Sequence, residues 1–419
     1  MNMKYSFFNI KIEGFAKSSV LYNSLSDMFI VMKKELLEKY PDPVDSPCLD
    51  KLISGGFVVE DSVDEIAEYI KKARTIESDN KYKHIIINPT INCNFNCWYC
   101  YEMHTPSKMD VKTFDNLKKY ISKSCEECET LVLSFFGGEP LLYYDEIMIP
   151  LLEYAYEMAS KKGIEMKSNC TSNGYLFNLA KVKNLKHYNF NFAQITLDGG
   201  KSFHDKTRTL HGGKGTFDKI VENIKILARE DVDVTVRINY TKENILSTQE
   251  IPCYFAELTD EQKKHLYFSF HKVWQEDNDP IDEASKVIQS FSDAGFVASR
   301  NILGSYCYGD LRNSSVINYN GDVYKCTAVD FNNVKRDGYL DENGCIVWEN
   351  ESLEERMRKK FSNKPCLNCK ILPICHGGCS SRPLLAAEDY CIFDFDEDKK
   401  MQSVLEKLDY NIKYKWNSK

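Results

Sequence analysis

Three cysteines in one short loop are the residues of this 419-residue chain best suited to chemistry. Cys93, Cys97 and Cys100 follow an apolar run at 85–87, with gaps of four and three residues. So short a loop can place three thiolates around one small metal centre but does not readily supply a fourth. A cubane iron–sulfur cluster normally takes four thiolates, so three leave one iron open. An open metal position indicates chemistry, as open catalytic zinc sites do beside closed structural ones.

Two other interpretations of the loop are a zinc knuckle and a disulfide. A zinc knuckle would need paired C-x-x-C units with a closing fourth ligand. The chain has 16 cysteines, but its first residues lack the apolar stretch of a signal peptide. The cytosol keeps thiols reduced, which disfavours disulfides there. Metal binding is therefore the better account of the cysteines.

Composition narrows the class of protein. Hydrophobic residues make up 43% of the chain and aromatic residues 12%, an ordinary globular balance. A net charge of −8 gives no basic field for nucleic acid. No apolar run approaches the ~20 residues that span a bilayer. We therefore expect a cytoplasmic, soluble protein with neither a nucleic-acid nor a membrane partner.

The elements after the loop must position it, and they alternate between strand and helix. Strands are predicted at 84–89, 131–136, 166–171, 193–197, 232–239 and 266–270, and helices at 111–124, 145–162, 217–228 and 250–258. Six strands alternating with helices predict a parallel sheet and an α/β fold. In parallel barrels, functional groups lie at the C-terminal ends of the strands.

Polar residues lie at the ends of three of these strands and on a fourth. They are Gly137-Gly138-Glu139-Pro140, Thr171-Ser172-Asn173-Gly174, Asp198-Gly199 with His204, Asp205 and Arg208 beyond, and Arg237 on the fifth strand. Taken singly, the first two are ordinary turns. Arg237 on an apolar strand needs a partner, either Asp198 or a ligand, or else forms a structural ion pair. His271 and Trp274, after the sixth strand, are candidates to line a substrate mouth, although an isolated histidine is usually a packed one.

The cysteine spacing, with Tyr99 before the last cysteine, and these segments resemble the radical S-adenosylmethionine (SAM) enzymes. The resemblance implies a partial (β/α)6 barrel, a [4Fe–4S] cluster on the three cysteines and SAM on its open iron. It implies a 5′-deoxyadenosyl radical that abstracts a hydrogen atom. Arg208 would meet the SAM carboxylate bidentately. The implied SAM-binding residues are Tyr99, Gly137, Gly138, Glu139, Ser172, Asn173, Asp198 and Arg208.

The last third of the chain resembles the cysteine-rich SPASM extension of this family. It carries Cys307, Cys326, Cys366, Cys369, Cys375, Cys379 and Cys391. The resemblance implies one auxiliary cluster on Cys366, Cys369, Cys375 and Cys391, and a second, nearer the barrel, on Cys307, Cys326 and Cys379. Zinc is the alternative metal. The second cluster has either Cys345 as its fourth ligand or one open iron. Asn320-Gly321 separately predicts a β-hairpin over 316–324.

Three domains are predicted: 1–80, 81–300 and 301–419. In the first we expect strands at 7–12 and 57–59 and helices at 28–40 and 64–73. This small α+β domain resembles the winged-helix-like recognition domain of peptide-modifying radical SAM enzymes, which implies leader-peptide binding at a sheet edge. The alternative is a plain packing extension of the barrel.

The resemblance implies a radical SAM peptide maturase that crosslinks a ribosomally made precursor peptide through a thioether or carbon–carbon bond. A low-potential electron donor, such as flavodoxin or ferredoxin, would be its redox partner. One alternative is a sulfatase-maturing enzyme that forms formylglycine. Such enzymes place an aspartate directly after the second SPASM cysteine, where this chain has Thr327. The second alternative to a peptide maturase is a non-catalytic iron–sulfur electron-transfer protein, which would need no SAM-binding cleft.

Overall fold

The computed structural model describes residues 2–13, 18–33, 46–273, 275–276, 279–300, 304, 306–381, 384 and 388–416, so Trp274 lies outside the described residues. The chain folds into two compact units. The barrel unit comprises Asn80–Asn301, Asn313–Leu353 and Tyr410–Lys419, and the cysteine-rich unit comprises Met1–Asp79, Ile302–Arg312 and Glu354–Asp409. The three predicted domains remain a proposal, because the barrel unit also takes in part of 301–419.

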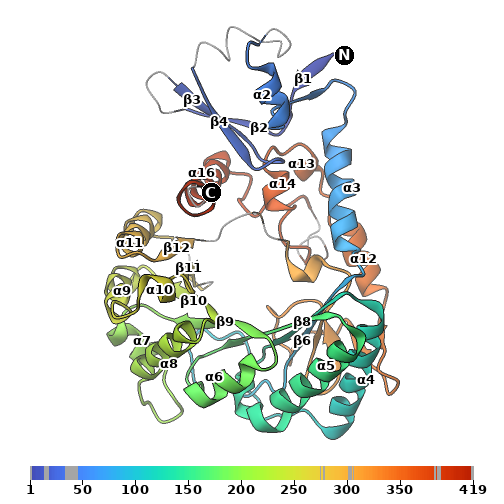
Figure 1. Ribbon diagram of the computed structural model, residues 1–419, viewed down its shortest axis with the longest axis vertical. Coiled ribbons are helices and arrows are strands. Elements are labelled where there is room, and N and C mark those ends of the chain that lie inside the picture. Colours follow the sequence, from blue (N-terminus) through green and yellow to red (C-terminus); the bar gives the residue numbers. More distant parts are fainter. Residues whose placement is uncertain are drawn as a thin grey trace. The chain divides into compact units, whose positions relative to one another are not determined.

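Parallel strands form the frame of the barrel unit (Figure 1). Its six central strands pair in chain order, and all six match the predicted ones. They are β6 (Tyr82–Ile87), β7 (Thr130–Phe135), β8 (Glu165–Ser172), β9 (Phe190–Leu197), β10 (Asp233–Tyr240) and β11 (Leu266–Lys272). The predicted α/β fold with parallel strands is confirmed. β12 (Val297–Arg300) adds one more parallel strand beside β11.

Helices pack against one face of this sheet (Figure 1). On β10, Val234, Val236 and Ile238 are at most 1% exposed and belong to the core that these helices cover. The alternate residues of each strand therefore face the opposite, inner side. The helices are α4 (Val111–Glu127), α5 (Ile149–Lys162), α6 (Leu179–Lys186), α7 (Lys201–Thr207), α8 (Phe217–Arg229), α9 (Ile251–Tyr254), α10 (Asp260–Lys263) and α11 (Ile281–Asp293). The predicted helix at 250–258 is only the short α9, and the chain then continues in turns in which the Phe255 and Leu258 N–H groups each donate to the carbonyl three residues earlier.

Four short strands extend the sheet beyond β6. β13 (Ser314–Ile317) pairs in parallel with β6, and β14 (Asp322–Tyr324) returns antiparallel to it. Gly321 sits in the intervening turn with φ of 82°, a conformation that glycine favours. The predicted hairpin is confirmed, and β15 (Gly338–Leu340) and β16 (Ile346–Trp348) continue the sheet.

The cysteine-rich unit begins with two small antiparallel sheets. β1 (Met3–Tyr5) pairs with β5 (Val58–Glu60), and the other sheet has the order β2 (Asn9–Ile12), β3 (Ser18–Asn23), β4 (Met28–Lys33). Phe8 and Tyr69 share a buried core with Phe361 and Leu372 from the other end of the chain. The helices of this unit include α2 (Leu49–Ser54), α3 (Glu65–Glu77), α13 (Lys364–Leu367), α14 (Leu372–Cys375) and α16 (Glu397–Tyr410); α12 (Ser352–Lys359) begins at its boundary.

The helix predicted at 28–40 is wrong over its first residues. Residues 28–33 form β4, which pairs along its whole length with β3, and 34–40 lie outside the described residues. Asp27 takes a left-handed φ of 56° in the turn that joins the two strands. Pairing with a neighbouring strand decides the structure here over local helix propensity.

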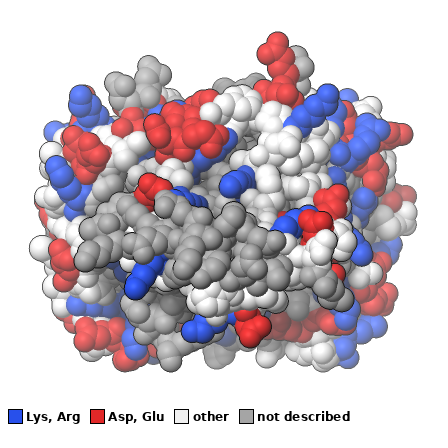
Figure 2. All heavy atoms as spheres, turned by 90° about the horizontal axis from the view of Figure 1, so that it is seen from above, with Lys and Arg blue, Asp and Glu red and all other residues white. Residues whose placement is uncertain are grey.

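Charged side chains are mixed in sign where the structure describes them. On the face shown in Figure 2, Lys and Arg alternate with Asp and Glu among the side chains drawn in colour. This mixing accords with a net charge of −8. No helix among the described residues is long and apolar enough to cross a membrane.

Candidate active site

The cysteine loop follows β6 at the C-terminal end of the sheet. Cys93 is buried, Cys97 is half-buried and Cys100 is exposed, and no disulfide joins any of the 16 cysteines, all of which the structure describes. Burial raises the pKa of the Cys93 thiol to about 12 and that of the Cys100 thiol to about 11. These thiols keep their protons until a metal displaces them, because a ligating cysteine is a thiolate.

The turn after β7 packs directly on the start of the cysteine loop. Gly138 N–H donates to the Thr90 carbonyl (3.2 Å), and Glu139 N–H donates to the Asn92 carbonyl (2.9 Å). A Cβ atom on Gly137 would lie 2.2 Å from the Thr90 oxygen. Glycine is therefore required here by the approach of two backbone segments, before any ligand is considered.

The Glu139 carboxylate joins the turns after β7 and β8. It is fully buried and accepts hydrogen bonds from the Leu141 N–H (3.0 Å), the Ser172 hydroxyl (2.9 Å) and the Asn173 N–H (2.8 Å). Burial raises the pKa of Glu139 to about 7, although the hydrogen bonds from these donors lower it. The Glu139 and Ser172 side chains therefore bond to each other, and this bond holds the turn after β8 against the turn after β7.

Asn173 connects that turn to the cysteine loop. Its side-chain amide donates to Asn94 Oδ1 (2.8 Å) and lies 3.7 Å from Cys93 Sγ. His211 Nε2 lies 2.9 Å from the Cys93 carbonyl oxygen. Sequence reasoning did not single out Asn94 or His211, since their role depends on contacts across about 80 and 118 residues of chain.

The Tyr99 hydroxyl is the centre of a buried polar cluster. It donates to Asp198 Oδ2 (2.6 Å) and accepts from Arg208 Nη1 (2.7 Å) and Asn239 Nδ2 (3.2 Å). Asp198 is 1% and Arg208 7% exposed. Asp198 Oδ1 and Arg208 Nε are buried and have no partner among the described residues. Buried polar atoms are rarely left unpaired, so this cluster fits a polar ligand.

His204 and Asp205 give the segment that carries Arg208 its shape. His204 Nδ1 accepts from the Asp198 N–H (3.3 Å), and its Nε2 lies 3.0 Å from the Thr216 hydroxyl. Asp205 Oδ1 accepts from the Thr216 N–H (2.7 Å). Burial lowers the pKa of His204 well below its ordinary value, so the imidazole is neutral and acts as a structural bridge.

Arg237 does not form the predicted ion pair with Asp198. Its Nε donates to Asn239 Oδ1 (2.9 Å), and it forms no ion pair with a carboxylate among the described residues. Tyr99 already occupies one oxygen of Asp198. The structural ion pair is thus also absent for the residues that the structure describes.

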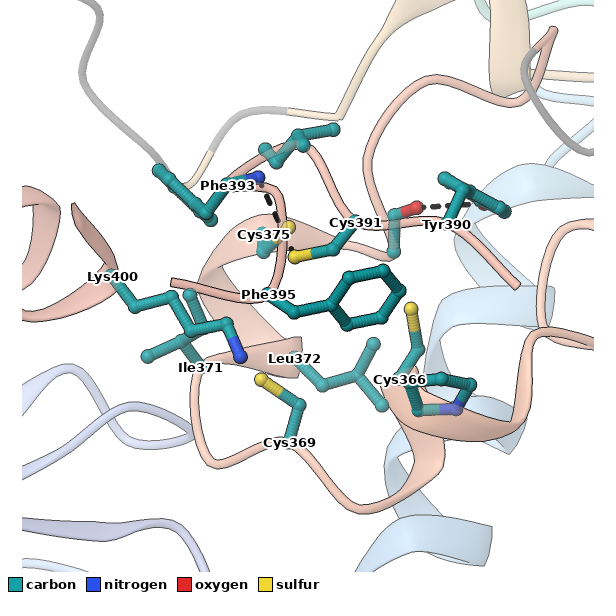
Figure 3. A pocket seen from close by; sticks show the side chains of 13 residues that line it. Cys366, Cys369, Ile371, Leu372, Cys375, Tyr390, Cys391, Phe393, Phe395 and Lys400 are labelled. Atoms are coloured by element: carbon teal, nitrogen blue, oxygen red, sulfur yellow. Dashed lines mark hydrogen bonds between the residues drawn. The ribbon is translucent and has the colours of Figure 1, made fainter. Parts of the chain in front are cut away.

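In the cysteine-rich unit, Cys366, Cys369, Cys375 and Cys391 line one pocket (Figure 3). The other residues that line it are mainly apolar, among them Ile371, Leu372, Ile392 and Phe393. Burial raises the pKa of the Cys375 thiol to about 12. Within the described part of the chain, no three His, Cys, Asp or Glu residues converge on the position of a single metal ion. A cluster instead distributes its ligands over several irons, which suits four thiols spaced around an apolar pocket.

The second predicted cluster draws on both units. Cys307 and Cys379 belong to the cysteine-rich unit and Cys326 to the barrel unit, so that ligand set remains a prediction. Cys345 is exposed in the turn between β15 and β16, and its sulfur lies 3.0 Å from Lys123 Nζ on α4. Cys326 precedes Thr327, whose carbonyl accepts from the Tyr101 hydroxyl at the end of the cysteine loop (3.1 Å).

A family model defines the class of this site. Residues 87–250, from the end of β6 to the start of α9, match the radical SAM superfamily. They include the cysteine loop, the turns that follow β7 and β8, and the Tyr99 cluster. This segment therefore matches a radical SAM domain, and domains of that superfamily bind SAM and a [4Fe–4S] cluster.

Two curated proteins are similar to this chain over about two thirds of its length or more. A cysteine-type anaerobic sulfatase-maturating enzyme of Clostridium novyi (strain NT) is 26% identical over 335 residues, which cover 70% of this chain and 87% of the relative. An Fe-coproporphyrin III synthase of Methanosarcina barkeri (strain Fusaro / DSM 804) is 23% identical over 68% of this chain and 71% of the relative. Relatives at this level of identity thus act on different substrates.

Two solved structures share the fold. The structure of anSMEcpe with bound AdoMet and a Cp18Cys peptide aligns with a TM-score of 0.58 at 20% identity, over 79% of this chain and 97% of that one. Streptococcus suis SuiB bound to the precursor peptide SuiA aligns with a TM-score of 0.54 at 14% identity, over 92% of this chain and 97% of that one. At these identities the likeness concerns the fold.

Proposed function

We propose that this protein is a radical SAM peptide maturase that modifies a ribosomally made precursor peptide and forms a thioether or carbon–carbon crosslink. The observation that carries the radical chemistry is the buried Tyr99 cluster beside the cysteine loop, with unpartnered polar atoms on Asp198 and Arg208. The fold shared with SuiB, which was solved with a precursor peptide, supports the peptide substrate.

Different residues of the chain would bind the cluster and SAM. Cys93, Cys97 and Cys100 would ligate the cluster, and Arg208, oriented through Tyr99, would receive the SAM carboxylate. Cluster and SAM together supply a 5′-deoxyadenosyl radical. The backbone of Gly137 and Gly138 is open to a ligand because it carries no side chain. Glu139, Ser172 and Asn173 contribute by fixing these turns, since their side chains bond mainly to one another and to the loop.

Two auxiliary clusters complete the proposal. Cys366, Cys369, Cys375 and Cys391 hold one in their shared pocket, and Cys307, Cys326 and Cys379 hold the other. Cys345 lies against α4 beside Lys123, so we propose that it is not a ligand. An auxiliary cluster would accept the electron released during crosslinking, and a low-potential partner such as flavodoxin or ferredoxin would donate the electron needed for SAM cleavage.

The β2–β4 sheet is the proposed binding site for the leader part of the precursor. Among the described strands, β4 pairs only with β3, and it exposes two apolar side chains, Met28 (48%) and Val31 (59%). An exposed apolar edge strand can accept a peptide as an additional strand. Deleting this domain would be a poor test, because Phe8 and Tyr69 contribute to the core around Phe361 and Leu372.

Val31→Asp tests leader binding at β4 more specifically than deletion of the domain does. We expect it to raise the KM for a full precursor peptide roughly tenfold, the effect of losing on the order of 1.4 kcal/mol of edge contact, and to leave a leaderless core peptide unaffected. Val347→Asp, on the exposed strand β16 of the barrel unit, is the matched control. Steady-state kinetics with a short peptide encoded beside the gene would measure both. Equal KM values for wild type and Val31→Asp would rule out leader binding at β4.

The sulfatase-maturing alternative is favoured by the Clostridium novyi relative and by the fold of anSMEcpe. The residue that follows Cys326 speaks against it, because Thr327 cannot act as the carboxylate base expected there. Incubation with SAM, dithionite and a cysteine-containing sulfatase peptide, followed by mass spectrometry for the aldehyde, separates the two. Formylglycine in that product would replace the crosslinking proposal. Failure to form 5′-deoxyadenosine at all would instead favour a non-catalytic electron-transfer protein.

A further inference from the structure

Arg237 is a partly buried cation that has no carboxylate partner in the part of the chain that the structure describes. Among the described residues its only hydrogen bond is the one from Nε to Asn239 Oδ1, which leaves both terminal nitrogens without one. Three other arginines of the barrel unit each form an ion pair within 2.9 Å: Arg229 with Glu257, Arg300 with Asp279, and Arg336 with Asp322. An unpaired charge in a partly desolvated position is costly, so Arg237 calls for an explanation.

The strand register places Arg237 on the inner side of the sheet. In the pairing of β10 with β11, Arg237 lies opposite Ser269 and Asn239 lies opposite His271. Their strand neighbours Phe268 and Phe270 belong to the core under the helices, so these four polar residues face the other way. Asn239 also donates to the Tyr99 hydroxyl. The guanidinium therefore stands beside the Tyr99 cluster, at the end of the barrel where the chemistry is proposed.

The neighbours of Arg237 do not neutralise it. His271 Nε2 lies 2.9 Å from the Ser269 hydroxyl, and burial together with the charge of Arg237 lowers the pKa of His271 to about 3, so the imidazole is neutral. The charge of Asp198 acts on Arg237 only from beyond ion-pair distance. Asn239 and Ser269 are uncharged. Among the described residues, the Arg237 guanidinium is therefore lined by the neutral side chains of Asn239, Ser269 and His271, and Asp198 lies beyond ion-pair distance.

We propose that Arg237 binds a carboxylate of the substrate peptide, from an Asp or Glu side chain or from the C-terminus, and so positions the peptide beside the bound SAM. A guanidinium meets a planar carboxylate through two parallel hydrogen bonds, which fixes orientation as well as charge. The inference rests on the proposed function, and it adds the class of substrate group that the site selects. Arg208, already bonded to Tyr99, remains the proposed partner of the SAM carboxylate.

The test uses full-length enzyme, reconstituted anaerobically with iron and sulfide and saturated with SAM. Three probes are titrated by calorimetry: acetyl-Ala-Glu-Ala-amide, acetyl-Ala-Gln-Ala-amide, and acetyl-Ala-Ala-Ala with a free C-terminus. The proteins are the wild type, Arg237→Gln, Arg237→Lys and Arg229→Gln, the last a surface arginine of α8 as matched control. SAM affinity and 5′-deoxyadenosine formation are measured on the same samples, so a failure of the proposed function is seen separately.

A carboxylate probe should bind wild type roughly tenfold more tightly than the Gln probe, because hydrogen bonds to a charged group are stronger than those to a neutral amide. Preference for the Glu probe identifies a side-chain carboxylate, and preference for the free C-terminus identifies the peptide end. Arg237→Gln should abolish the preference, Arg237→Lys should reduce it by losing the bidentate geometry, and Arg229→Gln should keep it. Equal affinities for all three probes, including no measurable binding, overturn the proposal, as does a preference that survives Arg237→Gln. Loss of SAM affinity without loss of the preference would assign Arg237 to SAM instead.

Discussion

Replacing Cys93, Cys97 and Cys100 together by alanine is expected to abolish SAM cleavage and to remove about a third of the iron. If all three proposed clusters are cubanes, the reconstituted enzyme should carry on the order of twelve irons, four of them in the cysteine loop. The loop is held in place by hydrogen bonds from the Gly138 and Glu139 N–H groups and from the Asn173 side chain, so the variant should leave its surroundings intact. Iron analysis and chromatography of 5′-deoxyadenosine after dithionite reduction measure the two effects.

Cys253→Ala provides the matched control for that variant. Cys253 is an exposed cysteine on α9 that we assign to no cluster, so its removal should change neither the iron content nor SAM cleavage. Cys345→Ala should behave in the same way if Cys345 is not a ligand. SAM cleavage that survives the triple change would show that the radical chemistry is assigned to the wrong cysteines.

Lys360→Met is expected to destabilise the cysteine-rich unit by about 3–5 kcal/mol. Lys360 Nζ lies 2.8 Å from both Glu77 Oε1 and Asp310 Oδ2, and all three side chains are 1% exposed. Removal of the shared cation leaves Asp310 buried without a counter-ion, whereas Glu77 keeps Arg74 at 2.9 Å. Glu77 comes from α3, Asp310 from the segment that follows Cys307, and Lys360 from the turn directly after α12. A lower midpoint in chemical denaturation would report the loss.

The neighbouring residue offers a close control. Lys359 forms an exposed ion pair with Glu355 one turn away on α12, and such pairs contribute only about 0.3–0.5 kcal/mol. Lys359→Met removes the same charge and adds the same apolar side chain one position earlier. Equal denaturation midpoints for the two variants would mean that the buried ion pair contributes no net stability.

Several features of the site follow from local sequence. The cysteine loop and the Gly137-Gly138 turn are contiguous segments, and the apolar runs that precede them mark β6 and β7. Spacing along the sequence is enough to predict a ligand set when all its members lie within eight residues. The parallel sheet was equally predictable, since each strand and helix carries its own period of apolar residues.

Other features depended on contacts between distant residues. Sequence reasoning assigned 28–33 to a helix, but β3 provides a strand partner and those residues form β4. It offered Asp198 as a partner for Arg237, yet the Tyr99 hydroxyl, 99 residues away in the chain, takes that carboxylate. The sequence of residues 1–80 does not indicate that Glu77, on α3, forms a buried ion pair with Lys360.

The sequence by itself determined which residues could ligate iron, because the chemistry of a thiol and its spacing within a loop are local properties. Only the tertiary structure decided which polar groups stand around that loop. Asn239, Arg208 and Asp198 meet at one tyrosine hydroxyl because parallel strands bring their C-terminal ends to the same edge. Burial then removes the water that would otherwise pair them, so the identity of each partner becomes a matter of geometry that no local pattern encodes.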